Sequence, residues 1–229
     1  MLNSRNADTL QKEIDHLSTL MSEERYANIK YVLSQRTKYM TVCLENIYHP
    51  QNASAVIRSA EAFGIQNVHV IEDISYFRPN IDIVQGSDRW IDITRYSRDT
   101  TSRYVIEQLK NKGYKILAAT PHGEDYTPQT VDISSPFALF MGTEKQGISS
   151  VLEENADSFI KIPMCGFVES LNVSVCAAIM MQTLTDRMRN SDIAWQLSND
   201  EKIEILHRWM QYAVRDSKTI LNRFRQDNE

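Results

Sequence analysis

From residue 40 onward, short apolar and β-branched runs alternate with longer segments of helical periodicity. This alternation is typical of an α/β domain, in which a mostly parallel sheet carries helices on both faces. Strands are predicted at 40–46, 68–72, 91–94, 114–119, 137–141 and 159–162. Helices are predicted at 53–63, 100–112, 151–156 and 172–189. Gly64 and Gly113 directly follow two of these helices, where a left-handed residue is favoured.

Helical segments precede and follow this domain. Leu10, Ile14 and Leu17 recur at helical spacing within residues 7–36, which predicts an N-terminal helical arm. A polar break after Arg189 leads to a second helical segment at about 200–224, which Ser198 or Asn199 could cap. We therefore expect a helical arm at 1–39, an α/β domain at 40–190 and a locally basic helical arm at 191–229.

The N-terminal residues are polar and carry both acids and bases, unlike a secretory signal or a transit peptide. The longest nearly apolar run, 173–181, has about half the length that a membrane span needs. We therefore expect a cytoplasmic protein. The three cysteines, Cys43, Cys165 and Cys176, lack CxxC spacing, which argues against a zinc site. We expect no metal.

The formal charge of −5 restricts any nucleic-acid surface to a local patch, because RNA affinity rests largely on cations that neutralise phosphates. Residues 202–225 are locally basic. They hold six Lys or Arg residues against Glu204 and Asp216. Alone, such a stretch is more often just a solvated helix face.

Three segments carry side chains suited to chemistry. The first, NASAVIRSAEAFG at 52–64, begins a helix after a strand; its simplest interpretation makes Asn52 an N-cap and Arg58 a surface charge. The second, FMGTEKQGIS at 140–149, follows a strand with a glycine turn. Gly142 and Gly147 have P-loop spacing, but Ile148 stands where that motif needs lysine. Such a crevice after a parallel strand is a common ligand site.

The third segment, IPMCGFVESLNVS at 162–174, is a loop of small and apolar residues that leads into a long helix. Ile162, Met164 and Leu171 could form the apolar walls of a cofactor pocket. Alone, the segment is also consistent with a plain loop capped by Ser170 or Asn172.

In this order, NASAVIR, FMGTEKQGIS and IPMCGFVESLNVSVCAA resemble the three motifs of the SpoU/TrmH family of SPOUT (trefoil-knot) RNA methyltransferases. The resemblance covers about 41–189 and implies S-adenosyl-L-methionine as cofactor, a C-terminal trefoil knot and a homodimer. The short helical arms resemble those of the family's tRNA (guanosine-2′-O-)-methyltransferases, which act on the D-loop guanosine at position 18. The resemblance thus implies tRNA as partner.

Matched position by position, the family pattern implies two sets of site residues. The catalytic set is Asn52, Arg58, Glu144, Ser170 and Asn172. The cofactor-binding set is Thr120, Gly142, Ile162, Met164 and Leu171. Because a guanidinium is essentially never deprotonated in proteins, our hypothesis is that Arg58 binds the phosphate beside the ribose and stabilises charge on the 2′-oxygen.

Three other functions remain open at this point. Ribosomal RNA or another tRNA ribose could be the substrate, and a non-catalytic RNA-binding member of the fold would share the sheet. Intact first and third motifs argue against the latter. A dinucleotide-dependent oxidoreductase would also suit an α/β domain, but the sequence has no GxGxxG.

Overall fold

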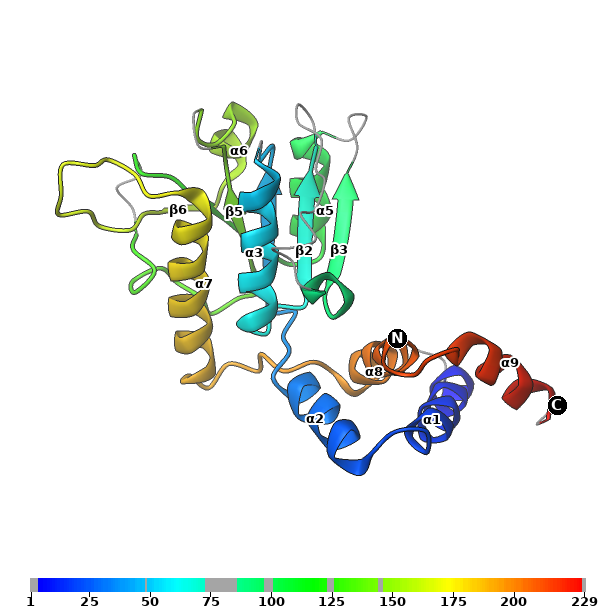
Figure 1. Cartoon of the computed structure of the whole chain (residues 1–229). Coiled ribbons are helices and arrows are strands. Elements are labelled where there is room, and N and C mark those ends of the chain that lie inside the picture. The colour runs from blue at the N-terminus through cyan, green and yellow to red at the C-terminus, as the bar shows by residue number, and fades with distance from the viewer. Residues whose placement is uncertain are drawn as a thin grey trace. The chain divides into compact units, whose positions relative to one another are not determined.

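The computed structural model describes residues 4–47, 49–72, 86–96, 101–122, 126–143 and 146–227 (Figure 1). The chain forms two compact units. One is Thr37–Trp195; the other combines Met1–Arg36 with Gln196–Glu229.

The larger unit is built on a six-stranded sheet in the order β3-β2-β1-β5-β4-β6, in which every described pairing is parallel. The predicted α/β class with a mostly parallel sheet is therefore confirmed. The strands are β1 Met40–Glu45, β2 Asn67–Ile71, β3 Asp92–Tyr96, β4 Lys115–Ala119, β5 Phe137–Met141 and β6 Ser158–Ile160.

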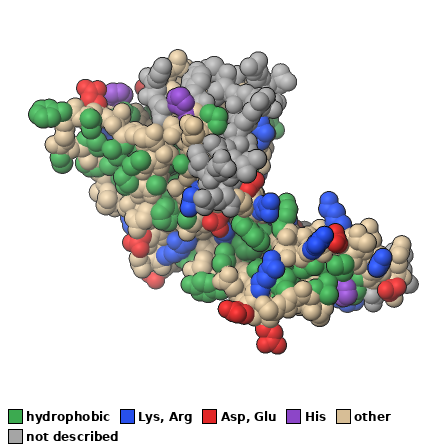
Figure 2. All heavy atoms as spheres, viewed as in Figure 1, with side chains coloured by type: hydrophobic (Ala, Val, Ile, Leu, Met, Phe, Trp, Pro, Cys, Tyr) green, Lys and Arg blue, Asp and Glu red, His purple; other side chains and the backbone are tan. Residues whose placement is uncertain are grey.

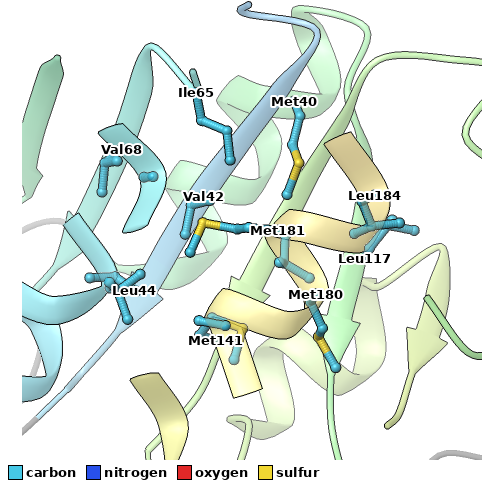
Figure 3. Packing of buried hydrophobic residues seen from close by; sticks show 14 of the residues in the cluster. Met40, Val42, Leu44, Ile65, Val68, Leu117, Met141, Met180, Met181 and Leu184 are labelled. Atoms are coloured by element: carbon cyan, nitrogen blue, oxygen red, sulfur yellow. The ribbon is translucent and has the colours of Figure 1, made fainter. Parts of the chain in front are cut away.

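Helices cover both faces of this sheet. Buried residues of α3 (Pro50–Ala62) and α7 (Val173–Arg189) pack on one face, and those of α5 (Ser102–Asn111) and α6 (Ser150–Asn155) pack on the other. Successive strand residues serve opposite faces, because side chains alternate along a strand. Val42 and Leu44 thus join the α3 and α7 side together with Met181 (Figure 3), whereas Cys43 joins the other.

Capping residues explain where the helices begin. Thr101, Ser149 and Asn172 each accept a backbone N–H with a side-chain oxygen at the starts of α5, α6 and α7. The interpretation of Asn52 as an N-cap is wrong. His49 is the N-cap of α3, and Pro50 supplies a preset φ at the first helical position, so Asn52 lies inside the first turn.

Two strands, β3 and β6, end two residues away from the predicted position. β3 runs to Tyr96, two residues beyond the expected end, because it pairs with the whole of β2. β6 ends at Ile160 and not at residue 162. Its partner strand β4 ends at Ala119, which pairs with Ile160, so Ile162 lies in the following loop. On its other side, Ile160 bridges Tyr126, and the N–H of Lys161 donates to the carbonyl of Tyr126. The left-handed glycines are confirmed at Gly64 (φ 78°) and Gly113 (φ 86°).

The smaller unit contains helices from both termini. They are α1 Ser4–Ser18, α2 Glu23–Ser34, α8 Asn199–Ala213 and α9 Ser217–Gln226. Ser198 caps α8 through a reciprocal capping box with Glu201. The Arg36 guanidinium lies 5.1 Å from the ring centre of buried Trp209. In the described part of the chain, no helix has the length and apolar character needed to cross a membrane.

Candidate active site

A pocket of about 530 Å³ lies at the carboxyl ends of β4 and β5, where parallel sheets commonly bind ligands. Its wall combines residues that follow β4, the β5–α6 loop, the β6–α7 loop and the start of α7. All five residues expected to contact the cofactor line it: Thr120, Gly142, Ile162, Met164 and Leu171. The structure therefore brings together residues from three distant parts of the sequence, although their individual roles stay predictions.

The β5–α6 loop has a shape that only glycine permits at residue 142. A Cβ added to Gly142 would lie 2.3 Å from the carbonyl oxygen of Gly147. Thr143 and Gly147 exchange backbone hydrogen bonds of 2.8 and 3.0 Å, and Gly147 has a φ of 71°. Glu144, expected in the catalytic set, lies outside the described residues.

Residues of the first and third segments that are expected in the catalytic set meet through two asparagines. Asn172 Nδ2 donates to Asn52 Oδ1 at 3.2 Å, and Asn172 Oδ1 accepts from the N–H and the hydroxyl of Ser174. Asn172 thus caps α7 and reaches α3 with the same amide group. Ser170, two residues earlier, lines the pocket.

The structure places Arg58 outside this cluster. Its side chain is exposed on α3 and is not among the pocket-lining residues. Arg58 follows Asn52 by six residues, or about 1.7 helical turns, so the two side chains point from different faces of α3. Within the described chain, no hydrogen bond or ion pair holds the Arg58 guanidinium. It is therefore available to an anion from outside the domain.

Sequence reasoning missed several pocket residues. Pro121 and His122 follow β4 directly, and Cys176 and Met180 project from α7. The first two could have been found, because residues just beyond a parallel strand face this edge of the sheet. Burial raises the pKa of Cys176 to about 11, so this thiol stays protonated near neutral pH and serves as a wall.

The comparisons with known proteins agree with this geometry. Residues 39–182 match the model of the SpoU rRNA Methylase family. The chain is 37% identical over 215 residues to the tRNA (guanosine(18)-2′-O)-methyltransferase of Borreliella burgdorferi, covering 94% of this chain and 97% of the relative. It is 34% identical over 171 residues to the protein of the same name from Escherichia coli K12, covering 75% and 73%.

A solved structure, the A. aeolicus TrmH/SpoU tRNA modifying enzyme, superposes with a TM-score of 0.75 at 29% identity. The match covers 85% of this chain and 98% of the other. Fold, pocket and relatives together define an RNA methyltransferase. The chain belongs to the SpoU rRNA Methylase family, whose members use S-adenosylmethionine as the methyl donor.

The pocket suits this donor in size and lining. Its volume lies within the range of about 300–1,000 Å³ that small-molecule sites occupy. Ile162, Met164 and Leu171 offer apolar walls for a flat base, whereas Lys161 and Glu169 supply charged groups for an amino-acid moiety. When bound, S-adenosylmethionine supplies an activated methyl group on its sulfonium.

Proposed function

We propose that this protein methylates the 2′-hydroxyl of the guanosine at position 18 of tRNA. The observation that carries the proposal is the match to the Borreliella burgdorferi enzyme, which extends over 94% of this chain and therefore includes helices of the smaller unit. The family domain alone would leave ribosomal RNA equally open.

In this proposal, each residue of the catalytic set has its own role. Asn52 and Asn172 hold each other at 3.2 Å and orient the groups around the pocket mouth. Arg58 binds the phosphate next to the target ribose with its two-pronged guanidinium and stabilises charge that develops on the 2′-oxygen. Ser170 and Glu144 complete the catalytic set, and the proton leaves through phosphate or water because Arg58 stays charged.

The proposal includes a homodimer. Val175 and Ile179 stand on one face of α7 with 47% and 39% of their surface exposed, and Phe167 and Val168 of the preceding loop are more exposed still. Figure 2 shows hydrophobic side chains gathered over this part of the larger unit. A second copy would bury such a face. Sedimentation should give a dimer mass for the native chain and a monomer mass for Val175→Asp/Ile179→Asp.

We also propose the family's trefoil knot, and one connection supports it. The chain that joins neighbouring strands β4 and β5 first passes the outer side of β6, where Tyr126 bridges Ile160. The Arg187 side chain of α7 then donates to the carbonyls of Pro128 and Val131 in the same connection. This segment therefore lies against both β6 and the helix that follows it.

A tRNA substrate also supports a cytoplasmic location.

A methyl-transfer assay tests the function. The purified chain is incubated with labelled S-adenosylmethionine and either a tRNA transcript carrying G18 or the same transcript with A18. We expect one label per transcript, resistant to alkaline cleavage at position 18, and none on the A18 transcript. Label on a base, on another ribose, or only on ribosomal RNA would reject the proposal.

A further inference from the structure

Glu45, at the carboxyl end of β1, is a buried acid that the function above does not use. Its side chain is 2% exposed. Glu45 Oε1 accepts the Ser149 hydroxyl at 2.7 Å, and Oε2 accepts the Ser149 N–H at 3.1 Å. Both oxygens thus engage one residue that lies 104 positions later in the chain.

Glu45 differs from the other buried glutamates of the described chain in its partners. Glu13 pairs with Arg225 and His207, and Glu72 pairs with Arg95. Glu45 has only the two neutral donors of Ser149 within the described residues. Burying a carboxylate without a cation is costly, so fold stability alone does not explain an acid at this position.

Capping of α6 does not require Glu45. Ser149 already accepts the N–H of Leu152 at 3.1 Å with its own oxygen, which is a complete N-cap. The carboxylate adds a fixed link between β1 and Ser149 instead. This link lies at the carboxyl ends of the strands, where the pocket also lies.

The link joins two of the segments that carry predicted site residues. Ser149 ends the β5–α6 loop, of which Gly142, Gly147 and Ile148 line the pocket. Glu45 ends the strand that leads within five residues into α3, which carries Asn52 and Arg58. The contact therefore connects the pocket proposed for S-adenosylmethionine to α3, the helix that carries the residues proposed to bind the RNA.

We infer that Glu45 is a positioning residue, which holds the β5–α6 loop through Ser149 and so sets the affinity for S-adenosylmethionine. The inference rests on the proposed function for the identity of the ligand. Glu45→Gln keeps the length of the side chain, but its amide nitrogen cannot accept a hydrogen bond. Ser149→Ala removes the hydroxyl from the other side of the same contact.

Calorimetry with S-adenosylmethionine and steady-state kinetics on G18 tRNA test the inference. We expect Glu45→Gln and Ser149→Ala each to raise the Kd about tenfold, equivalent to about 1.4 kcal/mol. The KM for the donor should rise similarly while kcat stays within about threefold. The double variant should be no weaker than the weaker single variant, because both remove one shared contact.

Matched variants in the smaller unit separate positioning from general destabilisation. Glu13→Gln alters an equally buried acid, and Ser198→Ala removes an equivalent N-cap from α8. Both should lower the melting temperature and leave the Kd unchanged. An unchanged Kd in Glu45→Gln or Ser149→Ala overturns the inference. An equal rise of the Kd in Glu13→Gln overturns it as well. If Glu45→Gln does not fold, Ser149→Ala alone decides. Native protein that binds no S-adenosylmethionine overturns the proposed function itself.

Discussion

Arg58 is an exposed cation on α3 that has no partner within the described chain. Arg58→Lys keeps the charge but loses the paired N–H donors that match a phosphate. We expect kcat on G18 tRNA to fall about 100-fold, as when one transition-state donor is removed elsewhere, with an unchanged Kd for S-adenosylmethionine. Arg103→Lys, at an exposed position on α5, is the control and should leave kcat unchanged. Near-normal kcat in Arg58→Lys would exclude a requirement for bidentate geometry.

Asn172 combines two tasks that one substitution can separate. Serine caps helices about as well as asparagine but is too short to reach Asn52 from the start of α7. Asn172→Ser should therefore change the free energy of unfolding by less than about 0.5 kcal/mol, while methyl transfer falls about tenfold or more with the lost link to Asn52. Urea unfolding and kcat, measured side by side, check this. An unchanged kcat in Asn172→Ser would mean that the asparagine only caps α7.

At the scale of elements, the β5–α6 loop depends on one glycine. In Gly142→Ala the new Cβ would lie 2.3 Å from Gly147 O and 2.8 Å from Ile148 N, so the loop must open. We expect the Kd for S-adenosylmethionine to rise by at least about tenfold, or about 1.4 kcal/mol. Gly166→Ala in the β6–α7 loop is the control, since its Cβ meets no heavy atom within 4 Å. Similar affinities for the two variants would contradict this role for Gly142.

The elements themselves were largely predictable, because buried parallel strands appear as continuous apolar runs and helix caps carry local signals. All six residues of β1 are buried, and the sequence prediction placed this strand within one residue. The end of β6 was missed because its ladder with β4 stops where β4 ends, at Ala119 opposite Ile160, and local periodicity does not encode this pairing. The first turn of α3 was misread because Pro50 begins the helix before Asn52.

At the scale of the whole molecule, strand order decides which side chains meet, and periodicity does not encode it. The neighbouring positions of β1 and β5 bring Glu45 to Ser149, and the packing of α3 against α7 allows Asn52 to meet Asn172. Motif resemblance identified the pocket residues without this knowledge. It could not identify Glu45, because a lone acid at the end of a strand carries no sequence signal.

The smaller unit joins both ends of the chain through Glu13, whose carboxylate accepts from Arg225 of α9 and lies 2.6 Å from Nε2 of His207 in α8. Burial raises the pKa of Glu13, but the hydrogen bonds from Arg225 and His207 outweigh it, so the pKa lies below its usual value. A lowered folded pKa stabilises the fold above the unfolded pKa of about 4.3, and the contribution is lost as pH falls through the folded value.

Glu13→Gln should therefore cost about 1.5–3 kcal/mol of unfolding free energy at pH 7, the range for hydrogen bonds to charged groups. The difference from the native chain should stay constant down to about pH 5 and then shrink, because acid protonates the native carboxylate and removes the same interaction. Urea unfolding followed by circular dichroism across pH 3–7 measures it. Glu107→Gln, at an exposed position on α5, should have a free energy of unfolding within about 0.5 kcal/mol of the native value at every pH. A difference that grows toward acid would show that Glu13 is held in its neutral form.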